Sequence, residues 1–255
     1  MIPCVDAILR EVADDNQIAA ISHYSQDPQA TSVPLDWASR FPAVGDGAED
    51  VAAMRPDLVI TGPHVAPQTA AMLDRLGVRQ LRIGVPASVA ESKAQVSEVA
   101  RVTGHPGRGD ALNRRIDDAV TAARSVTRKH APVALIWQDG GLVPGKGTLA
   151  DELLGLAGFR SASEQLRLPP WTMLSIEDLL WAPPDIVLTG SAGMESDGLR
   201  GDDRMKRHPA LAGARGHIML ADFPSSLLHC GGPVIIRTAD RLAEVRRRWD
   251  RERGS

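Results

Sequence analysis

Two periodicities of hydrophobic positions run along this chain, one helical and one typical of buried strands. In residues 3–15 the apolar side chains recur with helical spacing, at Val5, Ile8, Leu9 and Val12. Short apolar runs bounded by Pro, Gly or polar residues predict strands at 17–22, 57–62, 79–85, 132–138, 185–190 and 217–222. Helical patterns lie between them, at 48–54, 66–76, 88–103, 148–158, 175–181 and 232–251. Short strands that alternate with helices predict an α/β fold with parallel, doubly wound sheets.

This alternation is interrupted once, near the middle of the chain. The helix expected at 88–103 should break at GHPGRGD (104–110), and a second helix should run from Asp110 to about Thr127. The strand–helix alternation then resumes. We therefore expect an N-terminal α/β lobe at 1–105, a connecting helix within 106–130 and a C-terminal α/β lobe at 131–255.

Composition narrows the possible functions. The chain has 255 residues, with Lys+Arg 29 against Asp+Glu 32, so its net charge is −3. A near balance of charges argues against a broad basic surface for nucleic acid. Aromatic residues make up only 4%, so the position of each ring is informative.

Motifs for catalysis are absent from the sequence. It contains no GxGxxG after a strand, no GxxxxGK[ST], no GxSxG and no HExxH, and no Ser/His/Asp arrangement stands out. We therefore expect a protein that is not an enzyme and has no resident cofactor or metal. One alternative stays open: His23 and His64 both follow predicted strands and could ligate a metal, with Cys4, in a two-lobed α/β enzyme.

Candidate ligand-binding residues follow the predicted strands, because ligands of parallel sheets meet the loops at the carboxyl ends of strands. Four such loops are distinctive: 22–28, 61–67, 137–141 and 189–194. They and the Pro-flanked loop before SIEDLL supply the candidates Tyr24, Thr61, Gly62, His64, Trp137, Gln138 and Trp171. For Trp137, packing in the core is an equally good interpretation.

Ordered segments of this chain resemble a known family. PCVDAILREVADDNQIAAISHYSQDP, a Pro-rich loop and AEDVAAMRPDLVITG resemble the first lobe of the periplasmic binding proteins of ABC importers for vitamin B12, ferric siderophores and haem. VALIWQDGG, GTLADELLGLAGF, PPWTMLSIEDLLWAPPDIVLTG and CGGPVIIRTADRLAEV are similar to the second lobe. The resemblance implies two lobes joined by one long helix, with a ligand cleft between them.

Individual residues match the vitamin B12-binding member of that family. By this resemblance, Pro3 and Tyr24 correspond to cleft residues of the first lobe, and Trp171 to a cleft tryptophan of the second. Glu177 corresponds to a glutamate that docks on arginines of the membrane permease. A carboxylate after Ser175 also suits the first turn of a helix, and the two roles are compatible.

The function implied by the resemblance is capture of a metal chelate, a corrinoid such as vitamin B12 or a ferric siderophore. The partner would be an ABC transporter permease in the inner membrane. The protein would act in the periplasm as a monomer, without nucleic acid. The chain begins where the family's first strand ends, so a signal peptide and the first strand are expected to be missing from it.

The two cysteines, Cys4 and Cys230, lie near opposite ends of the chain. By the resemblance, the segment at Cys230 returns toward the lobe junction, where Cys4 begins the first helix. In an oxidising compartment the two could form a disulfide. Two separate, partly buried thiols are the alternative, and the sequence does not decide between them.

Overall fold

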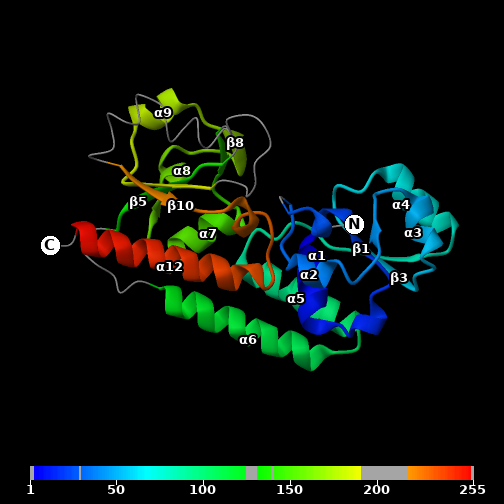
Figure 1. Cartoon of the computed structure of the whole chain (residues 1–255). Coiled ribbons are helices and arrows are strands. Elements are labelled where there is room, and N and C mark those ends of the chain that lie inside the picture. Colours follow the sequence, from blue (N-terminus) through cyan, green and yellow to red (C-terminus); the bar gives the residue numbers. More distant parts are fainter. Residues whose placement is uncertain (1–2, 29, 125–130, 139–140, 191–217, 254–255) are drawn as a thin grey trace. The chain divides into compact units, whose positions relative to one another are not determined.

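A computed structural model describes residues 3–28, 30–124, 131–138, 141–190 and 218–253 (Figure 1). Contacts between Cα atoms divide the chain into two compact units. Unit 1 comprises Met1–Pro86, Ala90–Ile116 and His229–Val234, and unit 2 comprises Ala87–Val89, Asp117–Leu228 and Ile235–Ser255.

Unit 1 contains two pairs of parallel strands. β1 (Ile21–Ser22) pairs with β2 (Ala43–Val44), and β3 (Leu58–Thr61) pairs with β4 (Arg79–Arg82). Its helices are α1 (Pro3–Val12), α2 (Leu35–Ala38), α3 (Ala48–Ala53), α4 (Pro67–Arg75) and most of α5 (Val89–Val102), with 3-10 turns η1 (Asp15–Gln17) and η2 (His23–Gln26). Three residues of the predicted apolar stripe of α1, Val5, Ile8 and Val12, are buried, and the fourth, Leu9, is half-buried.

A prediction about the long helical region needs correction. α6 (Pro106–Ala123) begins at Pro106, four residues before Asp110. The break between α5 and α6 is at Gly104, which has φ 79°, a conformation that suits the end of a helix. Pro106 then fits the first turn of α6, where its missing N–H is not needed. Residues 125–130, which we counted with this helix, lie outside the described residues.

Unit 2 is built on a parallel sheet with strand order β10-β9-β5-β7. The strands are β5 (Val133–Ile136), β7 (Arg160–Ser161), β9 (Ile186–Thr189) and β10 (Met219–Asp222). All four residues of β9 are buried, which is typical of a central parallel strand covered on both faces. The helices are α7 (Leu149–Leu156), α8 (Ala162–Gln165), α9 (Ile176–Trp181) and nearly all of α12 (Val234–Arg253), with the 3-10 turn η3 (Ser225–Leu227).

Unit 2 also contains an antiparallel pair that the sequence pattern did not predict. β6 (Leu142–Pro144) pairs with β8 (Trp171–Met173), so that Pro144 lies opposite Trp171. The turn after β6 packs tightly, because a Cβ at Gly145 would lie only 2.0 Å from the Pro169 carbonyl oxygen. The segment that we expected to be a Pro-flanked loop is thus held as a strand.

The predicted fold class, α/β with parallel sheets, is confirmed. The lobe boundaries remain a prediction; α6 has residues in both units. Among the described residues, no helix combines the length and apolarity that a membrane crossing requires.

Candidate functional site

Tyr24 stands on a short turn that follows the first parallel strand. Its side chain is 42% exposed, and its ring centroid lies 3.9 Å from that of His23. The Gln26 amide holds the turn by donating to the carbonyl oxygens of Ala38 and Phe41, at 3.0 and 2.9 Å. The Tyr24 side chain is therefore exposed on a turn that hydrogen bonds hold in place.

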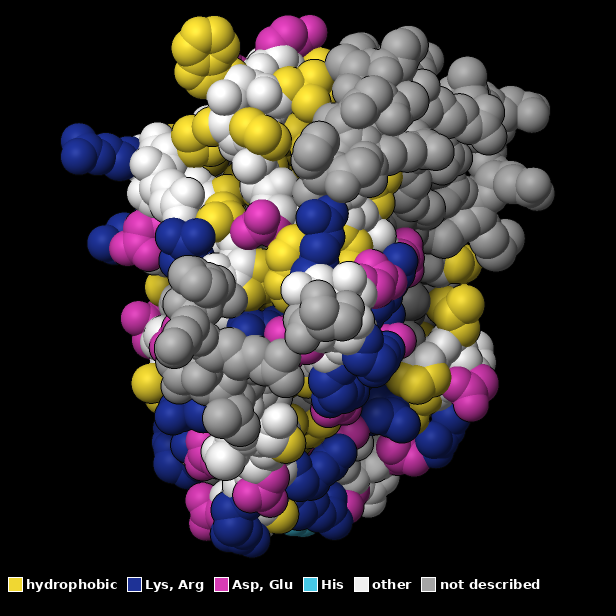
Figure 2. Space-filling model, turned by 90° about the vertical axis from the view of Figure 1, so that its left-hand side faces the viewer, with side chains coloured by type: hydrophobic (Ala, Val, Ile, Leu, Met, Phe, Trp, Pro, Cys, Tyr) yellow, Lys and Arg dark blue, Asp and Glu magenta, His cyan; other side chains and the backbone are white. Residues whose placement is uncertain are grey.

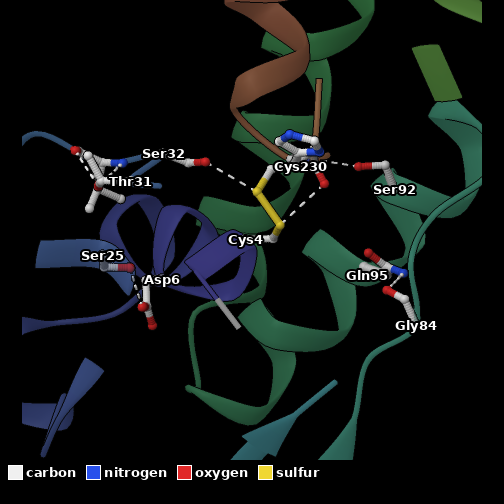
Figure 3. Close-up of a disulfide and its surroundings, with 12 residues drawn as sticks. Cys4, Asp6, Ser25, Thr31, Ser32, Gly84, Ser92, Gln95 and Cys230 are labelled. Atoms are coloured by element: carbon white, nitrogen blue, oxygen red, sulfur yellow. Dashed lines mark hydrogen bonds between the residues drawn. A yellow bond between two sulfur atoms is a disulfide. The ribbon is translucent and has the colours of Figure 1, made fainter. Parts of the chain in front are cut away.

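A buried carboxylate lies behind this turn. Asp6 of α1 is 5% exposed, and its Oδ2 accepts a hydrogen bond from the Ser22 backbone N–H at 2.9 Å. The same oxygen accepts a second one from the Ser25 hydroxyl at 2.6 Å (Figure 3). Burial raises the pKa of the Asp6 carboxyl to about 7, and the hydrogen bonds from Ser25 and Ser22 oppose this rise only in part. Sequence reasoning missed Asp6. The one hint was its position among the apolar residues of the first helix.

The TGPH turn lies at the carboxyl end of β3. Thr61 and Gly62 are buried and, with Pro63, line a cavity of about 480 Å³. The remaining walls come from Val65, from α4 with Asp74, and from the end of β4 and the two residues after it, 82–84. Neighbouring His64 is exposed and is not part of the cavity wall. Two of the three candidates in this turn therefore share a cavity within unit 1.

A metal site at His23 and His64 gains no support from the geometry. The Nδ1 atom of His23 lies 3.3 Å from the Val44 carbonyl oxygen. Cys4, the third ligand of that alternative, is bonded to Cys230. Within the described parts of the chain, no group of three or more His, Cys, Asp or Glu residues could hold a metal ion.

Trp137 and Gln138 follow β5 in the interior of unit 2. Trp137 is 5% exposed and belongs to a core cluster with Leu135, Val187 and Leu179. Gln138 is fully buried, and its amide donates to the Phe223 carbonyl oxygen at 2.9 Å. The core interpretation of Trp137 thus has direct structural support, whereas ligand contact by either residue stays a prediction. Residues 139–140 and 191–194 of the predicted strand-end loops lie outside the described residues.

Trp171 and Glu177 are both exposed on unit 2. Trp171 lies on β8 and is 42% exposed. Glu177 lies in the first turn of α9, whose N-cap is Ser175: its hydroxyl accepts from the Asp178 backbone N–H at 3.1 Å. In the described structure Glu177 has no hydrogen-bond or ion-pair partner, so its carboxylate is available to a partner from outside the chain.

The structure joins Cys4 to Cys230 in a disulfide within unit 1 (Figure 3). The Cα atoms are 5.0 Å apart, although the two residues are separated by 226 positions in the sequence. The surroundings of the bridge are polar: the Ser32 hydroxyl lies 3.2 Å from the sulfur of Cys230. Nearby, the Gly232 backbone N–H donates to the Ser92 hydroxyl at 2.7 Å. Pro3, the remaining candidate, begins α1 beside Cys4.

Comparison with models of protein families shows to which family the chain belongs. The sequence profile described as "periplasmic binding protein" matches residues 2–224. The chain belongs to this family. The resemblance predicted from the sequence is thereby confirmed, and the metal-dependent enzyme is not favoured. A comparison with curated proteins found no match.

Solved structures of other periplasmic binding proteins share the fold. They include the periplasmic haem-binding protein RhuT from Roseiflexus sp. RS-1, with 23% identity, a TM-score of 0.73 and coverage of 96% of this chain and 94% of RhuT. The haem-binding HutB of Vibrio cholerae has 19% identity, a TM-score of 0.76 and 95% coverage of both chains. The vitamin B12-binding BtuF of Vibrio cholerae has 16% identity, a TM-score of 0.71 and coverage of 96% of this chain and 93% of BtuF.

Proposed function

We propose that this protein is the solute-binding protein of an ABC importer and captures a metal chelate in the periplasm. The observation that carries the proposal is the family match over residues 2–224. Similar structures are named for binding haem, vitamin B12 or iron, which are metals or metal chelates. The ligand is therefore a corrinoid, a ferric siderophore or haem.

Exposed aromatic side chains in each unit, and a cavity in unit 1, support this chemistry. Tyr24 of unit 1 and Trp171 of unit 2 are exposed, and each offers an aromatic face on which a flat macrocycle or an apolar siderophore can stack. Thr61 and Gly62 line a cavity at the end of β3. Binding sites for such chelates combine aromatic and apolar side chains with a few polar groups, and these residues are of those kinds.

Glu177 supports a role in delivery to a membrane permease. Its carboxylate is exposed and has no partner among the described residues. A carboxylate of this kind forms charge-assisted hydrogen bonds with arginine side chains. We therefore assign Glu177 to docking on the permease and not to ligand binding.

A ligand screen tests the proposal. Purified protein is heated with cobalamin, cobinamide, haem or ferric siderophores, and unfolding is followed by fluorescence or calorimetry. One of these classes should raise the melting temperature, because a ligand at a hundred times its Kd stabilises the native state by about 2.7 kcal/mol. Free Co²⁺ and Fe³⁺ serve as controls for metal alone. Failure of all the chelates to stabilise the oxidised protein would contradict the proposal.

Replacement of Trp171 tests its place in the site. Trp171→Ala should weaken binding of the chelate identified in the screen by about 1–3 kcal/mol, as loss of a stacking side chain does. Titration calorimetry measures the Kd. Met54→Ala is the matched control, since Met54 at the end of α3 is a large hydrophobic residue with a similar exposed fraction, 37%. An unchanged Kd for Trp171→Ala would remove Trp171 from the site.

A further inference from the structure

The exposed hydrophobic side chains of unit 2 are gathered in one short segment. In the described part of unit 2, the large hydrophobic residues classed as exposed are Trp171, Met173 and Trp181, at 42%, 63% and 91%. All three lie on β8 and α9. Trp171 is accounted for by the proposed ligand site, but Trp181 is not.

Trp181 contributes almost nothing to the packing of α9. The helix is anchored by Leu179, which is 1% exposed, and by Ile176 and Leu180, which pack against the same core cluster. Trp181 is the last residue of the helix and is 91% exposed. The largest apolar side chain of the helix thus lies in water while the smaller ones are buried or partly buried, which is typical of a surface that a partner covers.

Acidic residues accompany Trp181 on the helix. Glu177 and Asp178 precede it by four and three residues, and helical geometry places positions with these spacings on one face. Asp178 is held by the Ser175 hydroxyl, which donates to its Oδ2 at 2.7 Å. Hydrophobic and acidic side chains lie together at the top of the view in Figure 2, and α9 is at the top of the view in Figure 1. We call Glu177, Asp178 and Trp181 the α9 surface.

The negative charge of the α9 surface favours some partners for Trp181 over others. No Lys or Arg occurs from Leu168 to Gly190, whereas Glu177, Asp178 and Asp185 do. A second copy of the same surface would bring like charges together, and an anionic lipid surface would be repelled. A protein surface with arginine or lysine around an apolar pocket is complementary.

We propose that Trp181 is the apolar centre of the surface by which this protein docks on its permease, with Glu177 beside it as the charged contact. The inference rests on the proposed function, and it names a residue and an interaction that the family resemblance did not supply. Exposed tryptophans that enter a pocket of the partner carry a large share of the binding energy in protein interfaces. The acidic neighbours then set the approach and register.

The experiment measures docking and ligand binding separately. The ABC importer from the same bacterium, reconstituted in phosphatidylcholine nanodiscs, is titrated with the chelate-loaded protein. Trp181→Ala should weaken docking by about thirtyfold, the loss typical of a hot-spot residue. Trp181→Phe should recover most of this loss because it keeps an aromatic ring. Met54→Ala is the control for an exposed hydrophobic residue outside unit 2, and Glu177→Gln reports the charged contact.

The outcomes separate this inference from the proposed function. Support requires weakened docking of Trp181→Ala with an unchanged Kd for the chelate. If wild type docks and Glu177→Gln weakens docking but Trp181→Ala does not, the inference fails and the proposed function stands. Wild type that binds neither chelate nor importer overturns both. Trp181-dependent binding to vesicles containing phosphatidylglycerol, or Trp181-dependent dimerisation in sedimentation, would overturn the inference in favour of a lipid or a second copy.

Discussion

Removal of the Cys4–Cys230 disulfide should destabilise unit 1 by about 5 kcal/mol. In the chain-entropy model the loss grows with the length of the closed loop, and this bridge spans 226 positions. The bridge ties the segment His229–Val234 to the N-terminal part of the same unit. Without it, only packing and hydrogen bonds such as that from Gly232 to Ser92 hold the segment.

The measurement compares thermal and denaturant unfolding of the oxidised protein, the reduced protein and the double variant Cys4→Ser/Cys230→Ser. Reductant should lower the stability of wild type and leave that of the double variant unchanged. Thiol titration of the denatured, unreduced protein from an oxidising compartment should find no free thiol. Two free thiols per chain would show that the bridge does not form.

The stability of unit 1 should fall as the pH rises from about 4 to 7, because of Asp6. Burial raises the pKa of this carboxyl from 3.8 to about 7 in the folded protein. Between these values the folded state keeps a proton that the unfolded state has lost, so the free energy of unfolding decreases with rising pH. The stabilisation is complete below pH 3.8 and is lost above pH 7. Its full size is at most about 4 kcal/mol.

Denaturant unfolding between pH 4.5 and 8 measures this dependence. Below pH 4.5, carboxylates whose pKa is lowered in the folded protein make the free energy of unfolding increase with pH, opposite to the effect of Asp6. Asp14 is one of them, because the hydrogen bond from Arg108 lowers its pKa. Asp6→Asn keeps an acceptor for the Ser22 N–H and the Ser25 hydroxyl but cannot titrate. The free energy of unfolding of this variant should therefore change less with pH than that of wild type. Asp36→Asn, at an exposed position of α2, is the matched control. Equal slopes for wild type and Asp6→Asn would contradict the assignment.

Most helices and the longer strands could be predicted from the sequence, because their apolar positions repeat with the period of one element. α1, α4 and α7 lie within one to three residues of the ranges that the pattern predicts. β3 and β9 are continuous apolar runs between turn residues, and both are parallel strands. The N-cap Ser175 was likewise visible as a serine before an acidic pair.

The candidate site was less predictable, because exposure depends on neighbours that are distant in sequence. Trp137 follows a predicted strand and Trp171 lies in a Pro-flanked segment before a predicted helix, and both were candidates for ligand binding. The helices and strands packed over β5 bury Trp137, whereas the pairing of β6 with β8 leaves Trp171 exposed. No local pattern distinguishes the two tryptophans.

The sequence by itself determined the α/β class, the order of most helices and strands, and the family of this protein. The fold class and the family follow from local periodicity and from the order of short motifs, and both can be read along the chain without knowing which segments pack together. Only the tertiary structure decided that Cys4 meets Cys230, that Asp6 is buried beneath the Tyr24 turn, and that Trp181 is left in water. These three facts arise from packing between segments far apart in the sequence, where the identity of each neighbour is decided by the fold as a whole.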